Sequence, residues 1–127
     1  MKISESEEQK KLVQWLRLRK IFHFSVANEN QQSSTNKMMA IKIASKHKAM
    51  GRVSGTCDIF VLLPNIMLAI EMKTAPTKLK SGKLSKSRAV TSDNQKKFIS
   101  DINEFKYADS RVCYGFDEAR DFIESFR

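Results

Sequence analysis

The sequence predicts an α/β protein in which a small mixed β-sheet is flanked by helices. Two short apolar runs, rich in branched side chains, meet at Pro64-Asn65, as expected of buried strands on either side of a turn. Apolar residues at helical spacing occur both before and after these runs. The length of 127 residues is typical of one domain, so we expect a single domain over residues 1–127.

The first half of the chain predicts a helix, a strand and a second helix. Acidic residues occupy the first turn of the first helix, where the helix dipole favours them, and Gly51 is suited to end the second helix. The expected elements are a helix capped by Ser4 or Ser6 and running to about Lys20, a strand from Ile21 to Val26, a polar loop from Asn28 to Asn36, and a helix capped by Thr35 or Asn36 and running to about Met50.

The second half predicts the two paired strands, a helix, a strand and a last helix. Residues 74–90 are rich in lysine and lack a hydrophobic period, so we expect a mobile loop ordered by phosphate contacts, or alternatively a solvated linker. After that loop we expect a helix capped by Thr91 or Ser92, a strand from Arg111 to Tyr114 and a helix from Phe116 to Phe126. The order is therefore α-β-α-β-β-α-β-α.

Each expected helix carries apolar residues on one face. The four faces consist of Leu12, Val13, Trp15, Leu16 and Leu18; Met39, Ile43, His47 and Met50; Phe98, Ile99, Ile102 and Phe105; and Ala119, Phe122, Ile123 and Phe126. We expect His47 to be a phosphate neighbour or a helix-surface residue rather than a metal ligand, because no second histidine lies at metal-binding spacing.

Within residues 55–73, which contain the two apolar runs, charged residues occur only at the two ends. Asp58 precedes the first run, while Glu71 and Lys73 end the second and share a strand face. If the runs pair as a hairpin, Asp58 lies beside Glu71. Two carboxylates beside an apolar sheet are costly unless neutralised, and Mg²⁺ or Mn²⁺ would neutralise them, with Lys73 orienting or deprotonating a water. A carboxylate–lysine pair at the surface is the alternative.

The charge balance favours an acidic partner such as nucleic acid, because 23 basic residues face 14 acidic ones and the net charge is +9. A basic protein without such a partner is the alternative. The basic residues cluster on both sides of the candidate site in sequence. Those expected to contact DNA phosphates are Lys46, Lys48, Arg52, Lys78, Lys80, Lys83, Lys86 and Arg88.

Cys57 and Cys113 match no metal-binding spacing, and we expect two buried thiols in a reducing cytoplasm. Residues 1–20 are charged throughout, so no signal peptide is expected. No apolar run approaches the roughly 20 residues that span a bilayer.

Five short motifs occur in an order and at spacings that match a known family. They are Glu5-x-x-x-Gln9 before an apolar helix, Asn28-Glu29 after the first strand, Gly51-x-x-x-Gly55-x-x-Asp58, Glu71-x-Lys73, and Ser92-x-x-Gln95. Together they resemble the VRR-NUC domain, a branch of the PD-(D/E)xK nuclease superfamily with a restriction-endonuclease-like core. Cys57 stands where that family usually has proline, and the segment between Lys73 and Ser92 is longer than usual.

The resemblance implies hydrolysis of DNA phosphodiester bonds with Mg²⁺ or Mn²⁺. It implies that Asp58, Glu71 and the main-chain carbonyl of Met72 bind the metal, with Glu5, or less favourably Glu8, assisting from the first helix. Lys73 would position or activate the attacking water, Gln95 would support the site from the third helix, and Gln9 would orient its neighbours.

The resemblance to family members of this size implies an enzyme that cuts branched DNA, four-way (Holliday) junctions above all, in the cytoplasm of a bacterial or virus-infected cell. Because a junction presents two related strands and this chain is one small domain, we expect a homodimer. Recognition would follow DNA shape, with little base reading and no membrane partner. A nuclease for flapped, nicked or single-stranded DNA is a second hypothesis within the same class. Two further hypotheses are a non-catalytic DNA-binding module with a relic site, and a basic interaction protein or enzyme inhibitor.

Overall fold

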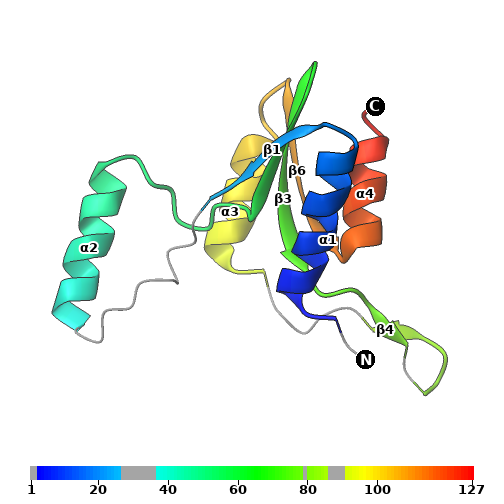
Figure 1. The fold of residues 1–127 in the computed structure, drawn as a ribbon. Coiled ribbons are helices and arrows are strands. Elements are labelled where there is room, and N and C mark those ends of the chain that lie inside the picture. Colours follow the sequence, from blue (N-terminus) through cyan, green and yellow to red (C-terminus); the bar gives the residue numbers. More distant parts are fainter. Residues whose placement is uncertain (1–2, 27–36, 79, 86–90) are drawn as a thin grey trace.

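The computed structural model describes residues 3–26, 37–78, 80–85 and 91–127 (Figure 1). The expected order of helices and core strands is confirmed, with a small additional hairpin between the third strand and the third helix. The elements are α1 (Glu5–Leu18), β1 (Phe22–Ser25), α2 (Lys37–Ala49), β2 (Ile59–Leu63), β3 (Ile66–Lys73), β4 (Thr77–Lys78), β5 (Leu84–Ser85), α3 (Asp93–Ile102), β6 (Ala108–Tyr114) and α4 (Phe116–Glu124).

The central sheet has the strand order β1-β2-β3-β6. Strands β1, β2 and β3 pair antiparallel, and the turn at Pro64-Asn65 joins β2 to β3. Strand β6 pairs with β3 in parallel, so the chain crosses over through α3 between them. Strand β3 is flanked on both sides and is buried from Leu68 to Lys73, which explains its nearly continuous apolar sequence.

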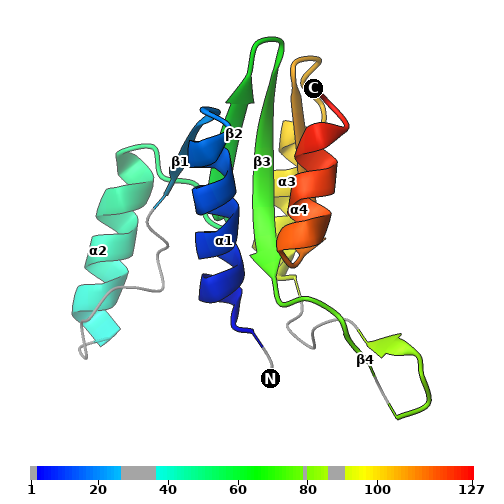
Figure 2. The ribbon, with the colours of Figure 1, turned by 45° about the vertical axis from the view of Figure 1, so that its right-hand side comes forward.

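Helices cover both faces of the sheet, and the alternation along β3 decides which side chain meets which helix (Figure 2). Leu68, Ile70 and Met72 belong to the larger core cluster, which contains the buried residues of α1 and α4. Ala69 belongs to the second cluster, which packs against α3. Because side chains two apart share a face, Glu71 lies on the α3 side of the sheet, as Ala69 does.

The first helix begins as expected, with Ser4 rather than Ser6 as its cap. The Ser4 hydroxyl accepts a hydrogen bond from the Glu7 N–H at 3.2 Å, and the Glu7 carboxylate accepts one from the Ser4 N–H at 3.2 Å. This capping box fixes the start of α1. It also places Glu5 at the first position of the helix.

Some apolar residues that were expected on helix faces are exposed near the ends of their helices. Leu18 points to solvent because α1 ends there and Lys20 adopts a left-handed backbone. Phe105 lies beyond α3, which ends where the Asn103 side chain bonds to the backbone of Ser110 in β6. Phe126 lies past the end of α4 and contacts Phe122 edge-on.

Two strand predictions also need correction. Strand β6 begins at Ala108 rather than Arg111, because its small and polar first residues pair with Met67, Leu68 and Ala69. The expected loop at residues 74–90 contains the β4–β5 hairpin, in which Thr77 pairs with Ser85 and Lys78 with Leu84. Two-residue strands held by backbone hydrogen bonds leave no hydrophobic period in the sequence.

Some predictions lie outside the described residues. They concern the caps Thr35 and Asn36 of the second helix, the Asn28-Glu29 motif, and the basic residues Lys86 and Arg88. Gly51 follows α2 with a positive φ of 98°, as expected of a helix stop.

Both cysteines are buried thiols, as expected. Within the described ranges, no helix combines the length and the apolar character that crossing a membrane would require.

Candidate functional site

The β2–β3 hairpin places Asp58 opposite Glu71. Ile59 pairs with Ile70 in the antiparallel register, so the residue before Ile59 faces the residue after Ile70. The prediction that the hairpin brings these two carboxylates together is therefore confirmed. The short turn at Pro64-Asn65 sets this register, since Leu63 and Ile66 pair directly on either side of it.

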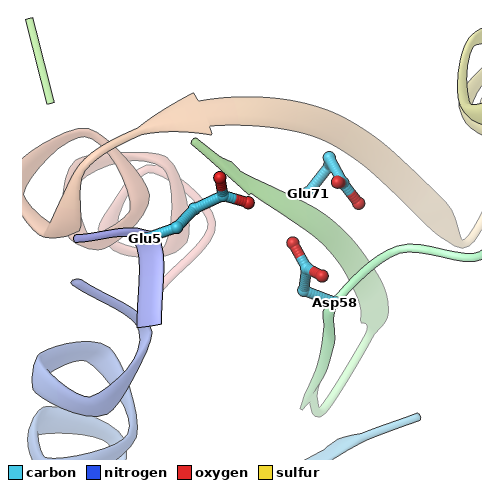
Figure 3. A group of neighbouring side chains, drawn as sticks. All are labelled: Glu5, Asp58 and Glu71. Atoms are coloured by element: carbon cyan, nitrogen blue, oxygen red, sulfur yellow. The ribbon is translucent and has the colours of Figure 1, made fainter. Parts of the chain in front are cut away.

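Glu5 joins these two carboxylates from the first turn of α1. Each of Glu5, Asp58 and Glu71 offers one oxygen, and these oxygens lie within 4.8 Å of one another. Figure 3 shows the three side chains reaching toward one another from the start of α1, the entrance to β2 and the end of β3. Residues far apart in the sequence thus converge at one end of the sheet.

Lys73 and Gln95 complete the surroundings of Glu71. The Lys73 ammonium lies 3.6 Å from Glu71 Oε1, and both side chains are buried. Gln95 Nε2 donates a hydrogen bond to the same oxygen at 2.8 Å. The other end of the Gln95 amide accepts from the Ser92 N–H at 3.0 Å, within the capping box of α3. Gln95 therefore connects the start of α3 to the carboxylate cluster.

The backbone of Met72 also faces the cluster. Its N–H donates to Asp58 Oδ2 at 2.8 Å, while the next carbonyl, that of Lys73, accepts from the Gly115 N–H at 2.9 Å on the β6 side. Peptide groups along a strand alternate in direction, so the Met72 carbonyl is directed to the Asp58 side of β3. The side chain of Met72, by contrast, is in the core.

The electrostatics of the cluster favour protonation. Burial raises the pKa of Glu71 to about 7; the charge of Asp58 adds to this rise and that of Lys73 opposes it. Burial also raises the pKa of Asp58, against the opposing hydrogen bond from Met72. The pKa of Glu5 is raised, again chiefly by burial. When all three acids are ionised they outnumber the single positive charge of Lys73, so protonation of the cluster relieves their mutual repulsion.

This donor set fits a divalent cation. Glu71 Oε2 is buried and has no hydrogen-bond partner among the described residues, although it lies in a cluster of carboxylate oxygens. A buried carboxylate oxygen without a partner is costly, and a cation bound by several carboxylates removes both that cost and the mutual repulsion. Oxygen-only ligands suit Mg²⁺ or Mn²⁺.

Glu8 lies elsewhere, although it is only one turn from Glu5. Its buried carboxylate accepts a hydrogen bond from the Phe116 N–H at the first position of α4. Gly115, the cap residue of α4, has no side chain to do this. Glu8 therefore caps a second helix, where the helix dipole favours a carboxylate, and Glu5 is the first-helix acid in the cluster.

Substitution of Glu5 is expected to affect metal binding, whereas substitution of Glu8 is expected to affect stability. Glu5→Gln is expected to weaken Mg²⁺ binding about tenfold or more, with little loss of stability in the metal-free protein. Glu8→Gln is expected to cost about 1–2 kcal/mol of unfolding free energy, because a charged helix cap is lost, while Mg²⁺ binding is retained. Urea unfolding with and without Mg²⁺ measures both quantities, and each variant serves as the control for the other. The reverse pattern would assign the metal role to Glu8.

Gly55 brings the loop before Asp58 against the start of α3. A Cβ at this position would lie 2.4 Å from the carbonyl carbon of Asn94 and 2.6 Å from the Gln95 nitrogen, and Gly55 has a φ of 79°. Only glycine permits this approach. The glycine in the motif Gly55-x-x-Asp58 therefore positions Gln95 as well as Asp58, a function that the spacing alone did not reveal.

Gly55→Ala is expected to cost about 2–4 kcal/mol and to separate Gln95 from Glu71, because the added methyl group displaces the first turn of α3. Gly51→Ala is the matched control, since Gly51 also has a positive φ but nothing in the described structure lies within 4 Å of its added Cβ. That variant should lose only about 1 kcal/mol. Chemical denaturation compares the two. Equal losses would show that the contact with α3 is unimportant.

Cys57 packs beneath the site rather than in it. Its thiol lies 3.5 Å from the Ser110 hydroxyl, which donates to the Ala69 carbonyl at 2.9 Å. Burial raises the pKa of Cys57 to about 12, so the thiolate needed for metal binding or nucleophilic attack is disfavoured. The sequence did not indicate this link to β6, because Ser110 lies 53 residues away.

The basic residues whose backbone the structure describes lie on α2, just after it, and on the β4–β5 hairpin. Lys46 and Lys48 are exposed on α2, and Arg52 follows it, with its guanidinium 3.1 Å from His47 Nδ1. Lys48 and Arg52 line a groove of about 560 Å³ that reaches Asn94, the neighbour of Gln95. Lys80 and Lys83 are exposed at the tip of the β4–β5 hairpin, which follows Lys73, and Lys78 lies on β4.

Comparison with known proteins identifies the fold. No model of a protein family matches the sequence, and no curated protein matches it either. A solved structure described as a "VRR_NUC domain protein" is similar with a TM-score of 0.58 and 18% identity, covering 98% of this chain and 88% of the other. The resemblance inferred from the motifs is thus confirmed for the fold: nearly the whole chain shares the architecture of a VRR_NUC domain protein.

Proposed function

We propose that this protein is a Mg²⁺- or Mn²⁺-dependent endonuclease that hydrolyses phosphodiester bonds in branched DNA, four-way junctions above all, as a homodimer. The observation that carries the proposal is the convergence of Glu5, Asp58 and Glu71, with oxygens within 4.8 Å of one another. The buried Glu71 oxygen that lacks a partner in the described part of the chain supports a cation there. The fold similarity is consistent with this activity.

The proposed metal ligands are Asp58, Glu71 and the Met72 carbonyl, with Glu5 binding directly or through a water. A bound divalent cation stabilises negative charge on the phosphate and promotes a nucleophile at neutral pH. The Met72 N–H holds Asp58 in place, and Gln95 holds Glu71, so neither carboxylate has to reorganise when DNA binds.

Lys73 is proposed to act on the attacking water. Its ammonium lies 3.6 Å from Glu71 Oε1 and is buried, so the side chain is held in one place at the cluster. From there it can donate a hydrogen bond to a water aligned with the phosphorus, or to a phosphate oxygen. The positive charge of Lys73 also offsets part of the negative charge that the scissile phosphate brings into the site.

DNA would be held through its phosphates. Lys46, Lys48 and Arg52 lie on or after α2, and the last two line the groove that leads to the start of α3. Lys80 and Lys83 lie on the hairpin beyond Lys73. Lys78, Lys86 and Arg88 belong to the same proposal by their place in the sequence. Such contacts follow the shape of the DNA backbone and carry little base specificity.

A homodimer suits a four-way junction because the substrate presents two related strands. Twofold symmetry would present two equivalent metal sites to them. Paired, symmetric cuts are the expected product of such an arrangement.

The decisive experiment compares a labelled four-way junction with a linear duplex of the same sequence. We expect cleavage of the junction with Mg²⁺ or Mn²⁺, no cleavage with EDTA, and much less cleavage of the duplex, with product mapping showing symmetric cuts. Flapped, nicked and single-stranded DNA belong in the same panel, because preference for one of them would keep the nuclease and change its substrate. Salt-sensitive binding without cleavage would instead indicate a DNA-binding module.

A further inference from the structure

A cavity lies at the end of the sheet opposite the carboxylate cluster. Strand β3 runs from the turn at Pro64-Asn65, which lines this cavity, to Glu71 and Lys73 at the cluster. Figure 2 shows the ends of α1 and α4 at the same end of the molecule as that turn, and the start of α1 at the other end. Because α1 has 14 residues, the cavity lies about 20 Å from Glu5. It is therefore separate from the proposed metal site.

This turn-end cavity has an apolar floor and a cationic rim. Its volume is about 740 Å³, which lies within the range of cavities that hold small organic groups. Among the residues that the structure describes, no acidic side chain lines it. The apolar lining includes Leu63, Ile66 and Phe126, and the cations are Arg19, Lys20 and Arg127. A complementary ligand combines a negative charge with an apolar or aromatic body.

Two of the three cations are available to such a ligand. The Arg127 guanidinium pairs with Glu124 at 2.9 Å, so it adds little net charge. Neither Arg19 nor Lys20 pairs with an acidic side chain in the described part of the chain. The surrounding sequence attracts anions as well. Residues 9–28 contain no acidic residue but five basic ones, which are Lys10, Lys11, Arg17, Arg19 and Lys20.

Lys20 has a backbone conformation that favours glycine. Its φ is 57°, and it is the only described residue other than glycine with a positive φ. The Ile21 N–H donates to the Leu16 carbonyl at 3.0 Å and the Lys20 N–H donates to the Arg17 carbonyl at 3.1 Å, which is the pattern of a helix end with glycine at this position. The helix dipole does not require Lys20, because Arg17 and Arg19 already lie at the end of α1. A lysine held at a cost to stability indicates a function for its side chain.

We propose that the turn-end cavity binds an unpaired nucleotide of a DNA strand, with its phosphate at Arg19 and Lys20 and its base on the apolar floor beside Phe126. The Phe126 side chain is 37% exposed, and bases of single strands stack on aromatic side chains. Bases inside a duplex are stacked on one another, so the cavity selects unpaired nucleotides. This inference rests on the proposed function only in taking DNA as the ligand.

One face of α1 connects the metal site to the turn-end cavity. Ser6, Gln9, Lys10, Gln14 and Arg17 line a groove along the helix, between Glu5 and the rim of the cavity. Their amides and cations can donate hydrogen bonds to the phosphates of one strand. A strand cut at the metal site would therefore carry its unpaired nucleotide some distance from the cut. At a branch point, base pairs that open would supply this nucleotide at the cost of unstacking.

Lys20→Gly tests the phosphate contact by moving affinity and stability in opposite directions. Fluorescence anisotropy in EDTA measures binding of a labelled single strand and of a blunt duplex of the same length. For the single strand, the slope of log K against log salt should fall by about 0.7, which is the loss of one phosphate contact and weakens binding about fivefold near 0.1 M salt. The same variant should melt about 2–5 °C higher, because glycine relieves the strain. Weaker binding would then not result from unfolding.

Lys42→Ala is the matched control for this variant. It removes the same charge from an exposed position on α2, outside the turn-end cavity. Its affinity for the single strand and its melting temperature should both stay close to the wild-type values. If Lys20→Gly keeps the wild-type salt slope, or loses affinity only as much as Lys42→Ala does, the phosphate site is wrong.

Phe126→Ala tests the contact with the base. Affinity for the single strand should fall about tenfold with an unchanged salt slope, while affinity for the blunt duplex stays the same. Phe105→Ala, which truncates an exposed phenylalanine outside the cavity, should change neither. Equal losses for single strand and duplex in Phe126→Ala, or no loss for either, would overturn the proposal. Because these measurements need no metal, binding as expected without cleavage would leave this inference standing and reject the nuclease instead.

Discussion

Asp58→Asn is expected to lower metal-dependent DNA cleavage by about 10³-fold or more, while the protein stays folded. Asparagine has the shape of aspartate, and its carbonyl oxygen can still accept the hydrogen bond that the Met72 N–H donates to Asp58 at 2.8 Å. The substitution therefore removes the charge and leaves the contact. Loss of activity would then report the missing negative charge at the cation site rather than a collapsed hairpin.

The measurement has two parts, a cleavage rate on junction DNA and the shift in melting temperature that Mg²⁺ produces. Both should fall in Asp58→Asn, and circular dichroism should be unchanged. Asp121→Asn is the matched control, because Asp121 is an exposed residue of α4 that pairs with its neighbour Arg120 at the surface. If Asp58→Asn cleaved junction DNA at the wild-type rate, the assignment of Asp58 to the metal site would be wrong, regardless of the fold similarity.

The sheet and the pairing of Asp58 with Glu71 could be predicted from sequence because local signals determine them. Two apolar runs and the turn at Pro64-Asn65 define the hairpin, and the length of that turn sets the register in which the strands pair. Lys73 shares the face of Glu71 by simple alternation. These inferences need no knowledge of the rest of the fold.

The choice between Glu5 and Glu8 could not be made in this way. Both lie in the first turns of α1, three residues apart. Glu8 accepts a hydrogen bond from the N–H of Phe116, which lies 108 residues away at the start of α4. The cap residue of that helix, Gly115, makes no side-chain hydrogen bond of its own. Only the packing of α1 against α4 shows which glutamate is needed there and which one reaches the sheet end.

Helix ends and short strands were also beyond sequence reasoning. Apolar spacing continued to Phe105, yet α3 ends at the side-chain bonds between Asn103 and Ser110. The β4–β5 hairpin is held by backbone pairing around Gly82, which has a φ of 84°. In both places hydrogen bonds, rather than hydrophobic burial, set the structure, and hydropathy patterns do not report them.

Glu71→Gln is expected to abolish cleavage yet stabilise the metal-free protein above pH 7. Glu71 is buried beside Asp58, and its pKa is raised from an ordinary value of 4.5 to about 7. Between pH 4.5 and about pH 7, the folded protein therefore holds a proton at Glu71 that the unfolded chain has already released. The resulting stability is fully present below pH 4.5 and is lost as the pH rises through about 7.

Glutamine imitates the protonated glutamate at every pH. Its carbonyl oxygen can still accept from Gln95 Nε2, and its amide group occupies the position of the oxygen that lacks a partner among the described residues. At pH 8 the metal-free variant should therefore exceed the wild type by about 1–3 kcal/mol in unfolding free energy. At pH 5 the two proteins should be nearly equal.

Adding Mg²⁺ should reverse the order, because the metal and the proton compete for the same carboxylate. The wild-type protein should gain more stability from Mg²⁺ at pH 8 than at pH 6, and Glu71→Gln should gain little at either pH. Urea unfolding across this pH range, with and without Mg²⁺, measures all four conditions, and Glu104→Gln, an exposed site, is the control. A metal-free variant that is less stable than the wild type at pH 8 would mean that the cluster tolerates its charges without a cation. A stabilised variant without activity would instead show that these carboxylates are kept together for the metal at a cost to the fold.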